Sequence, residues 1–263
     1  MNKKTEKEYF NDQWDKLKAY LKSFIENEDQ EQLHNFRVQV KKVRAMLTML
    51  DAYTKHQLLK DFKPVKKIFK QGGAIRDAYL HLKAAEHYKL DNEQFKISQQ
   101  SIVDDGIQQF KLQKAEYTKT VKKAYSIIER SIEPISNKDI VDFYKTELTL
   151  ISAALEVVAF DDTLHRCRRQ IKILMYNLKF TAKALEGKLQ VNEKYLNQLQ
   201  TAIGNWHDNV LAIELFSSPE LNEKAIVTKL KRQNTRLKKS IITLSVDFYA
   251  KVTTVEEITN EQK

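Results

Sequence analysis

The chain has 263 residues and a mass of 30.9 kDa, which is enough for one large core or two smaller ones. Its 45 Lys and Arg residues against 35 Asp and Glu give a formal net charge of +10, which favours an anionic partner. The sequence has no apolar run of the roughly 18 residues that a membrane-spanning helix needs, and its 42% hydrophobic residues argue against extended disorder. These numbers exclude a transmembrane protein and predict a globular one.

Cysteine usage and the first residues predict the compartment. Cys167 is the single cysteine, so the chain forms no internal disulfide bond. The first ten residues carry positive charge, but no apolar segment comes after them as it would in a signal peptide. We therefore expect a cytoplasmic protein.

Helical periodicity and a scarcity of Gly and Pro predict an all-α fold. We expect two sets of four helices, separated by a break at Glu133-Pro134. Gly72-Gly73 could kink the third helix, and Asp104-Asp105-Gly106 could split the fourth. The predicted helices, in chain order, span residues 5–28, 31–52, 56–90, 92–131, 138–160, 162–187, 192–217 and 220–250.

The two halves of the chain match each other without a gap when Leu33 is aligned with Leu164. This register preserves polar residues as well as leucines, which chance would rarely do. The matched pairs include Leu33/Leu164, His34/His165, Arg37/Arg168, Gln39/Gln170, Lys41/Lys172, Gly73/Gly204 and Asp77/Asp208. We interpret the protein as a tandem duplication, with repeats at residues 1–133 and 134–263.

The second predicted helix of the first repeat has two contrasting faces. At 100° per residue, its cations fall on one side and its apolar residues on the other. The basic stripe consists of His34, Arg37, Lys41 and Arg44, with Lys42 beside it. No acidic residue lies between these positions to relieve their repulsion, so an anion should compensate. Arg forks and Lys ammonium groups suit phosphate oxygens, and His can become charged beside an anion.

The second repeat carries the same stripe as His165, Arg168 and Lys172, flanked by Arg169. A single stripe of this kind is more often a solvated face or a set of partners for core carboxylates. Its duplication in register favours an anion site instead. The successive cations lie about 5 Å apart along the axis, a spacing that suits a multivalent ligand. Because the stripes lie off the apolar faces, we expect their replacement to leave folding intact.

The third helix of each repeat contains a glycine and, four positions later, an aspartate. The segments are Gly73-Ala74-Ile75-Arg76-Asp77 and Gly204-Asn205-Trp206-His207-Asp208. Because Gly in a helix costs about 1 kcal/mol relative to Ala, its recurrence indicates a close helix crossing. Asp77 and Asp208 could orient a neighbouring cation of the site, or could simply form structural ion pairs.

Two other lysine-rich clusters could extend an anion site. Lys66, Lys67 and Lys70 share one face of the third helix. The last helix carries cations all round it, which favours a solvated surface; they are Lys229, Lys231, Arg232, Arg236, Lys238 and Lys239. We find no metal-ligand spacing, Gly-rich phosphate loop or catalytic constellation. We therefore predict no metal, no cofactor and no enzymatic activity.

Both motif pairs resemble the conserved histidine α-helical domain (CHAD) family. Leu33-His34-x-x-Arg37-x-x-x-Lys41-Lys42-x-Arg44 is similar to its first signature, and Leu164-His165-x-x-Arg168-x-x-x-Lys172 to its second. The Gly73 and Gly204 segments resemble the segment that the family carries after each signature. The resemblance spans about residues 5 to 250. It implies two four-helix bundles with pseudo-two-fold symmetry, and binding of inorganic polyphosphate around the histidines.

The second half departs from the family pattern. Met175 stands where an Arg is usual and Lys179 where a Glu is usual, while Ile173 and His207 replace the cations Lys42 and Arg76 of the first half. A second site weaker than the first is therefore expected. The Glu-x-Glu-x-Lys signature of the CYTH domain, which often accompanies this family, does not occur in the sequence.

The sequence thus predicts a non-catalytic protein that binds polyphosphate and could bind other polyanions. We expect no membrane association, and the protein could associate with polyphosphate granules. A nucleic-acid-binding helical protein is the main alternative, although recognition helices and stacking platforms are missing. A polyphosphate-processing enzyme is less favoured because Asp77 and Asp208 are too few to hold metal ions. The predicted polyphosphate-binding residues are His34, Arg37, Lys41, Lys42, Arg44, Lys66, Lys70, Arg76, His165, Arg168, Arg169, Lys172 and His207.

Overall fold

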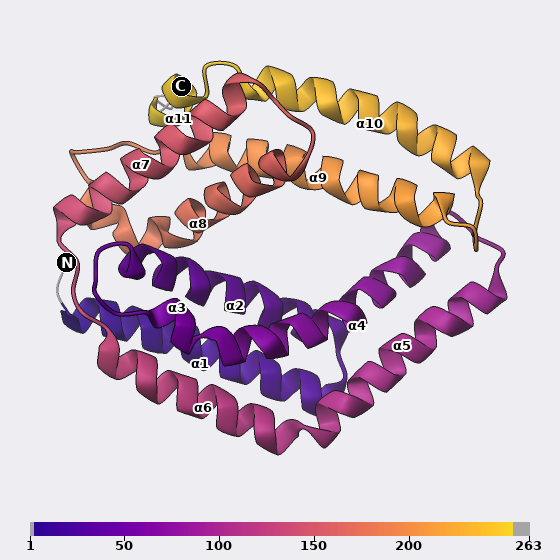
Figure 1. The fold of residues 1–263 in the computed structure, drawn as a ribbon, viewed down its shortest axis with the longest axis horizontal. Helices are drawn as coiled ribbons and strands as arrows, with labels where there is room; N and C mark the ends of the chain where they lie inside the picture. Colours follow the sequence, from indigo (N-terminus) through magenta and orange to yellow (C-terminus); the bar gives the residue numbers. More distant parts are fainter. Residues whose placement is uncertain (1–2, 255–263) are drawn as a thin grey trace, which may run out of the picture. The chain divides into compact units, whose positions relative to one another are not determined.

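A computed structural model describes residues 3–254, and within that range it contains eleven α-helices and no β-strand. The all-α prediction is confirmed. Figure 1 labels the helices in chain order. Their bounds are α1 Lys3–Asn27, α2 Gln30–Asp51, α3 Leu58–Asp61, α4 Lys63–His87, α5 Glu93–Leu112, α6 Lys114–Ser131, α7 Asn137–Glu156, α8 Asp162–Leu185, α9 Glu193–Ser217, α10 Lys224–Ser245 and α11 Phe248–Thr253.

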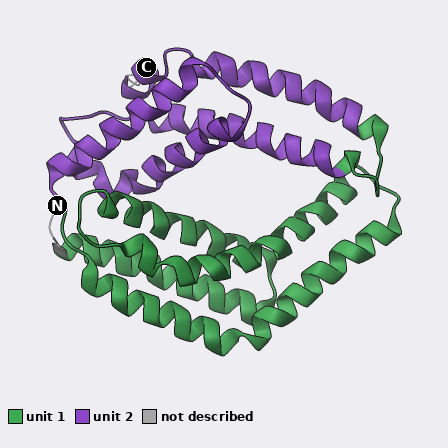
Figure 2. Ribbon diagram, in the orientation of Figure 1, with its two compact units in different colours: residues 1–135, 216–226 green, residues 136–215, 227–263 purple. Residues whose placement is uncertain are grey.

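The helices divide into two compact units, which Figure 2 shows in separate colours. The first comprises residues 1–135 with residues 216–226, and the second comprises residues 136–215 with residues 227–263. The boundary after Ile135 lies close to the predicted break at Glu133-Pro134. The predicted repeats did not assign residues 216–226 to the first unit. In the structure, Phe216 packs edge-on against Tyr88 of that unit, with ring centroids 5.1 Å apart. The predicted pseudo-two-fold symmetry stays a prediction.

Polar side chains cap several helix starts where the sequence indicates them. Asp29 accepts a hydrogen bond from the backbone N–H of Glu31, and Asp161 accepts one from that of Thr163. Ser136 and Asp139 form a reciprocal capping box at the start of α7. These caps satisfy backbone donors that the first turn of a helix leaves unpaired, and so fix where the helices begin.

Four predicted helices differ in extent from the observed ones, and of these the fifth, predicted to end at residue 160, ends at Glu156. The third is divided into α3 and α4, because Phe62 ends the first and Pro64 occupies the first turn of the second. The fourth breaks at Gln113, between α5 and α6, and not at Asp104-Asp105-Gly106. The eighth begins at Lys224 and not at residue 220, and the left-handed residue Asp247 separates α10 from α11.

The core of the first unit includes the apolar face of α2, which packs against both α1 and α4. Phe36, Val40, Val43 and Leu47 on this face are at most 3% exposed, whereas Lys41 and Arg44 are exposed on the other face. In the second unit, α7 packs on α8, whose buried residues include Leu164, Cys167, Ile171 and Leu174. The amphipathic pattern therefore places both basic stripes off the core.

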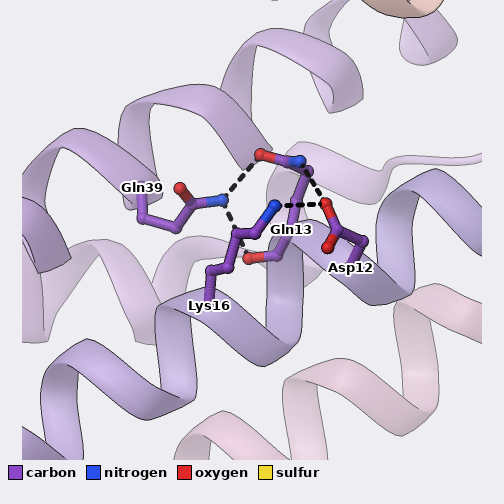
Figure 3. Close-up of polar contacts among 4 residues, drawn as sticks. All are labelled: Asp12, Gln13, Lys16 and Gln39. Carbon is purple, nitrogen blue, oxygen red and sulfur yellow. Dashed lines mark hydrogen bonds and ion pairs between the residues drawn. The ribbon is translucent and has the colours of Figure 1, made fainter.

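A buried polar contact fixes α2 against α1 (Figure 3). The side-chain amide of Gln39 donates to the backbone carbonyl of Gln13 at 2.9 Å and to its side-chain oxygen at 2.7 Å. The amide of Gln13 in turn donates to Asp12, which also accepts from Lys16. Because a buried amide is costly without its partners, this network favours one register between the two helices.

Candidate anion-binding site

Helices α2 and α4 of the first unit contribute cations to one shared face. Arg44 on α2 is the largest influence that lowers the pKa of Lys66 on α4, followed by burial and by Lys70 and Lys63. Arg44, Lys63 and Lys70 are therefore each close enough to Lys66 to repel its charge. Lys66 and Lys70 were predicted, whereas Lys63 was not. Its spacing three and seven residues before the other two lysines was the signal that could have revealed it.

His34 lies at the other end of the same face. Burial lowers the pKa of His34, and the neighbouring cations Arg76, Lys41 and Arg37 lower it further, while Glu31 opposes them. Arg76 comes from α4 and the other two from α2, so the structure brings together side chains from separate parts of the sequence. We call this set the α2/α4 basic face: His34, Arg37, Lys41, Arg44, Lys63, Lys66, Lys70 and Arg76.

Four cations of the α2/α4 basic face have no carboxylate partner among the described residues. Between residues 3 and 254, no carboxylate lies within 4.0 Å of the charged groups of Arg44, Lys66, Lys70 or Arg76. Asp77 raises the pKa of Arg37 from a greater distance. The charges of these four side chains can therefore attract an external anion.

Arg37 has a structural contact in addition to its charge. Its Nη1 donates a hydrogen bond of 2.7 Å to the backbone carbonyl of Phe69 on α4, and its guanidinium lies 4.3 Å from the centre of the Phe69 ring. The side chain is half-buried, and burial lowers its pKa. Arg37 therefore connects α2 to α4 at the centre of the basic face.

The recurring glycine makes room for this arginine. A Cβ at Gly73 would lie 3.1 Å from Nη1 of Arg37, which is closer than ordinary contact. In the second unit, a Cβ at Gly204 would lie 2.8 Å from Nη2 of Arg168, whose Nε donates to the backbone carbonyl of Gln200 at 3.1 Å. The ungapped alignment of the repeats pairs Gln200 with Phe69, so the two arginines use equivalent carbonyls. The glycine thus accommodates a guanidinium, where the sequence had indicated a close crossing of helix backbones.

The second unit brings His165 and His207 into contact. Their ring centroids are 4.6 Å apart, and the rings are tilted by 43°. The pKa of His165 is lowered by burial and then by His207, Arg169 and Arg168, with Asp162 opposing. His207 occupies the position that Arg76 has in the first repeat, so each half places a basic residue of the third predicted helix beside the signature histidine.

Lys172 completes the second group of cations. Burial lowers the pKa of Lys172, Arg168 lowers it further, and Asp208 raises it. The ammonium lies 5.8 Å from the centre of the Tyr176 ring. Asp77 and Asp208 therefore act on Arg37 and Lys172 respectively, without forming an ion pair within 4.0 Å of any residue in the described range.

The remaining predicted cations are less closely associated with these groups. Lys42 is half-buried on α2, and no hydrogen bond, ion pair or ring contact between described residues joins it to the α2/α4 basic face. On α10, Lys231, Arg232 and Arg236 are exposed, and Lys238 lies over the Phe160 ring at 4.8 Å. Among residues 3–254, no three His, Cys, Asp or Glu residues cluster as metal ligands would, and no helix is long and apolar enough to cross a membrane.

Comparisons with known proteins identify the family. The family model of the CHAD domain matches residues 8–217, which is most of the chain. The chain belongs to the CHAD domain family. A crystal structure of the CHAD domain from the plant Ricinus communis matches with a TM-score of 0.58 and 17% sequence identity, covering 94% of this chain and 89% of that one. This match supports the CHAD fold. No curated protein matches the chain.

Proposed function

We propose that this CHAD protein binds inorganic polyphosphate without chemically changing it, and that the α2/α4 basic face is its principal site. The observation that supports this most directly is that Arg44 from α2 and Lys70 from α4 both repel the charge of Lys66, while none of the three has a carboxylate within 4.0 Å among the described residues. A chain of phosphates would relieve that repulsion along its length.

The arrangement favours a long, flexible anion over a single phosphate group. Lys63, Lys66 and Lys70 extend over seven residues of α4, or about 10 Å at 1.5 Å per residue. Arg44 lies beside them, and His34 with Arg76 continues the face. Cations in a row can follow successive phosphates, and each Arg can hold two oxygens. We place the second site at His165, Arg168, Arg169, Lys172 and His207, as the weaker of the two.

We propose a cytoplasmic location for the protein and an association with polyphosphate granules. Binding of other polyanions is compatible with the same charges, because phosphate contacts alone do not distinguish between polymers. Nucleic acid is the alternative ligand that an experiment must exclude.

The test compares polyphosphate with duplex DNA at equal phosphate concentration. We expect tighter binding of polyphosphate, with the logarithm of affinity falling linearly against the logarithm of salt concentration, because neutralised phosphates release counterions. The triple variant Arg44→Ala/Lys66→Ala/Lys70→Ala should weaken polyphosphate binding at least about tenfold, equivalent to about 1.4 kcal/mol. Fluorescence anisotropy with labelled ligands measures both affinities.

A matched control removes three exposed lysines from outside the proposed site. The variant Lys119→Ala/Lys123→Ala/Lys145→Ala makes the same change in net charge and should bind within about twofold of the parent protein. Equal losses in the two triple variants would reduce the interaction to an effect of net charge. Equal or tighter binding of DNA would refute the polyphosphate assignment.

A further inference from the structure

A second surface of the first unit, between α1 and α6, has apolar residues at its centre and lysines on both sides. Helices α1 and α6 pack together and leave a groove of about 560 Å³ between them. Leu21 and Ile25 on α1 and Val121 and Tyr125 on α6 line it, each pair being one helical turn apart. Its volume lies within the range of ligand pockets, which is roughly 300 to 1,000 Å³.

Lysines surround this apolar floor on both sides. Lys18 and Lys22 contribute from α1, and Lys114 and Lys122 from α6. Lys18 pairs with Asp15 at 2.7 Å, and Lys114 pairs at 3.1 Å with Glu26, the one carboxylate among the lining residues.

Two of the rim lysines are available for an external anion. Lys22 and Lys122 are exposed, and neither forms an ion pair within residues 3–254. With Lys18 and Lys114 paired to Asp15 and Glu26, the charges of Lys22 and Lys122 leave the groove positive.

The distribution of these lysines indicates the shape of the ligand. Lys114 and Lys122 are eight residues apart on one helix, or about 12 Å, and Lys18 and Lys22 lie on the opposite rim. An amphiphile with one charged head would satisfy cations at one end of the groove only. Polyphosphate has no apolar part to cover the floor. A helix with an apolar stripe between two acidic flanks fits both the floor and the two rims.

We propose that the α1/α6 groove binds an acidic amphipathic helix of a partner protein. Apolar side chains of that helix, spaced at i and i+4, contact the half-buried Tyr125 and the edges of Leu21 and Ile25, which are 4% and 6% exposed, and its carboxylates pair with the lysines of both rims. The inference rests on charge complementarity and on the apolar floor, and is independent of polyphosphate binding because α1 and α6 carry none of the α2/α4 basic face.

The experiment uses the full chain and a synthetic helical peptide of about four turns, with Leu at i, i+3, i+4 and i+7 and Glu on both flanks. We expect it to bind, and a scrambled peptide of the same composition to bind at least about tenfold more weakly. The variant Lys22→Glu/Lys122→Glu should lose at least about tenfold in peptide affinity. Its matched control, Lys119→Glu/Lys123→Glu, reverses two exposed α6 lysines outside the groove and should change the affinity less than about twofold.

A steric variant separates groove binding from surface charge. Thr118 is an exposed lining residue, so Thr118→Trp should fill the groove and abolish peptide binding while the circular dichroism spectrum stays unchanged. Peptide binding that survives this change, equal binding of the scrambled peptide, or equal losses in the two charge-reversal variants would overturn the proposal. The proposal would also be overturned if the protein bound laurate but not the peptide, and if Lys22→Glu/Lys122→Glu weakened the binding of laurate. That result would assign the groove to a lipid-like anion. Polyphosphate affinity should change by less than about twofold in Lys22→Glu/Lys122→Glu, which keeps this test distinct from that of the proposed function.

Discussion

Arg37 and Arg168 each combine a charge with a hydrogen bond that holds two helices together. Each guanidinium donates to a backbone carbonyl of the next long helix and occupies the space beside a glycine. The sequence indicated the charge, and helical periodicity placed it off the core. Periodicity could not show that the side chain reaches across to α4 or α9. The expectation that folding is indifferent to these arginines is therefore revised, because a charge-assisted hydrogen bond contributes about 1.5 to 3 kcal/mol.

The histidines give the site a pH dependence whose direction is set by their surroundings. Burial lowers the pKa of both His34 and His165, and so do the cations around them: Arg76, Lys41 and Arg37 for the first, His207, Arg169 and Arg168 for the second. Glu31 and Asp162 oppose this effect. Both imidazoles are therefore mostly neutral at pH 7, since the pKa of each lies below its ordinary value of 6.5.

Polyphosphate affinity should rise as the pH falls below about 6.5, because the anion favours the imidazolium and binding takes up a proton. Binding titrations at several pH values, with the parent protein and with His34→Gln/His165→Gln, measure this pH dependence of affinity. Because the variant lacks both histidines, any pH dependence that it keeps comes from protonation of polyphosphate itself. Identical pH profiles for the two proteins would leave the histidines with a structural role only.

At the scale of helices, periodicity and caps predicted most of the fold. The predicted starts of the second and sixth helices lie within one residue of α2 and α8, where Asp29 and Asp161 accept the capping hydrogen bonds. The misplaced break in the fourth helix has a packing reason. Gly106 lies inside α5, where a Cβ would be 2.4 Å from Cγ1 of Ile75 on α4, so tertiary contact explains that glycine.

The contact between α1 and α2 through Gln39 makes a stability prediction (Figure 3). Gln39→Ala should lower the free energy of unfolding by about 1 to 3 kcal/mol, because it leaves the side-chain oxygen of Gln13 buried without its donor. Gln32→Ala, a half-buried position on the same helix without a hydrogen-bonded side chain among the described residues, is the control and should change stability by less than about 0.5 kcal/mol. Urea denaturation measures the free energy of unfolding of both variants. Equal losses of stability would show that the Gln39 contact does not have the role assigned to it.

At the scale of the whole molecule, the register of the two predicted repeats can be compared with the helix bounds of the described residues. The ungapped alignment of the repeats pairs Glu93, where α5 begins, with Lys224, where α10 begins. It also pairs Lys63 at the start of α4 with a residue in the first turn of α9. The repeat therefore predicted where equivalent side chains would lie, including the arginine, glycine and histidine positions. It could not predict the contact between His165 and His207, because His in place of Arg at this position changes which groups touch.

The two repeats differ in charge, and this difference allows a comparison with an internal control. Arg37→Ala/Lys41→Ala and Arg168→Ala/Lys172→Ala each remove one arginine bound to a helix carbonyl and one lysine four positions later. Each variant loses one hydrogen bond from an arginine to a helix carbonyl. The first also loses the contact of Arg37 with the Phe69 ring, and the second loses the half-buried Lys172, so the stability of each variant is measured before a difference in polyphosphate affinity is assigned to the anion sites.

We expect the first pair to weaken binding more, since the first repeat retains Arg44 and Arg76 at the positions where the second has Met175 and His207. Each lost contact is worth about 1.5 to 3 kcal/mol before screening by salt, so the comparison belongs at low ionic strength. Calorimetric titration with polyphosphate, beside melting curves of both variants, measures the two effects separately. A greater loss of affinity in Arg168→Ala/Lys172→Ala, with both proteins folded, would reverse the ranking of the two sites. If both double variants bind polyphosphate normally, the ligand does not bind at the signature helices α2 and α8. The basic residues of α10 would then be tested next.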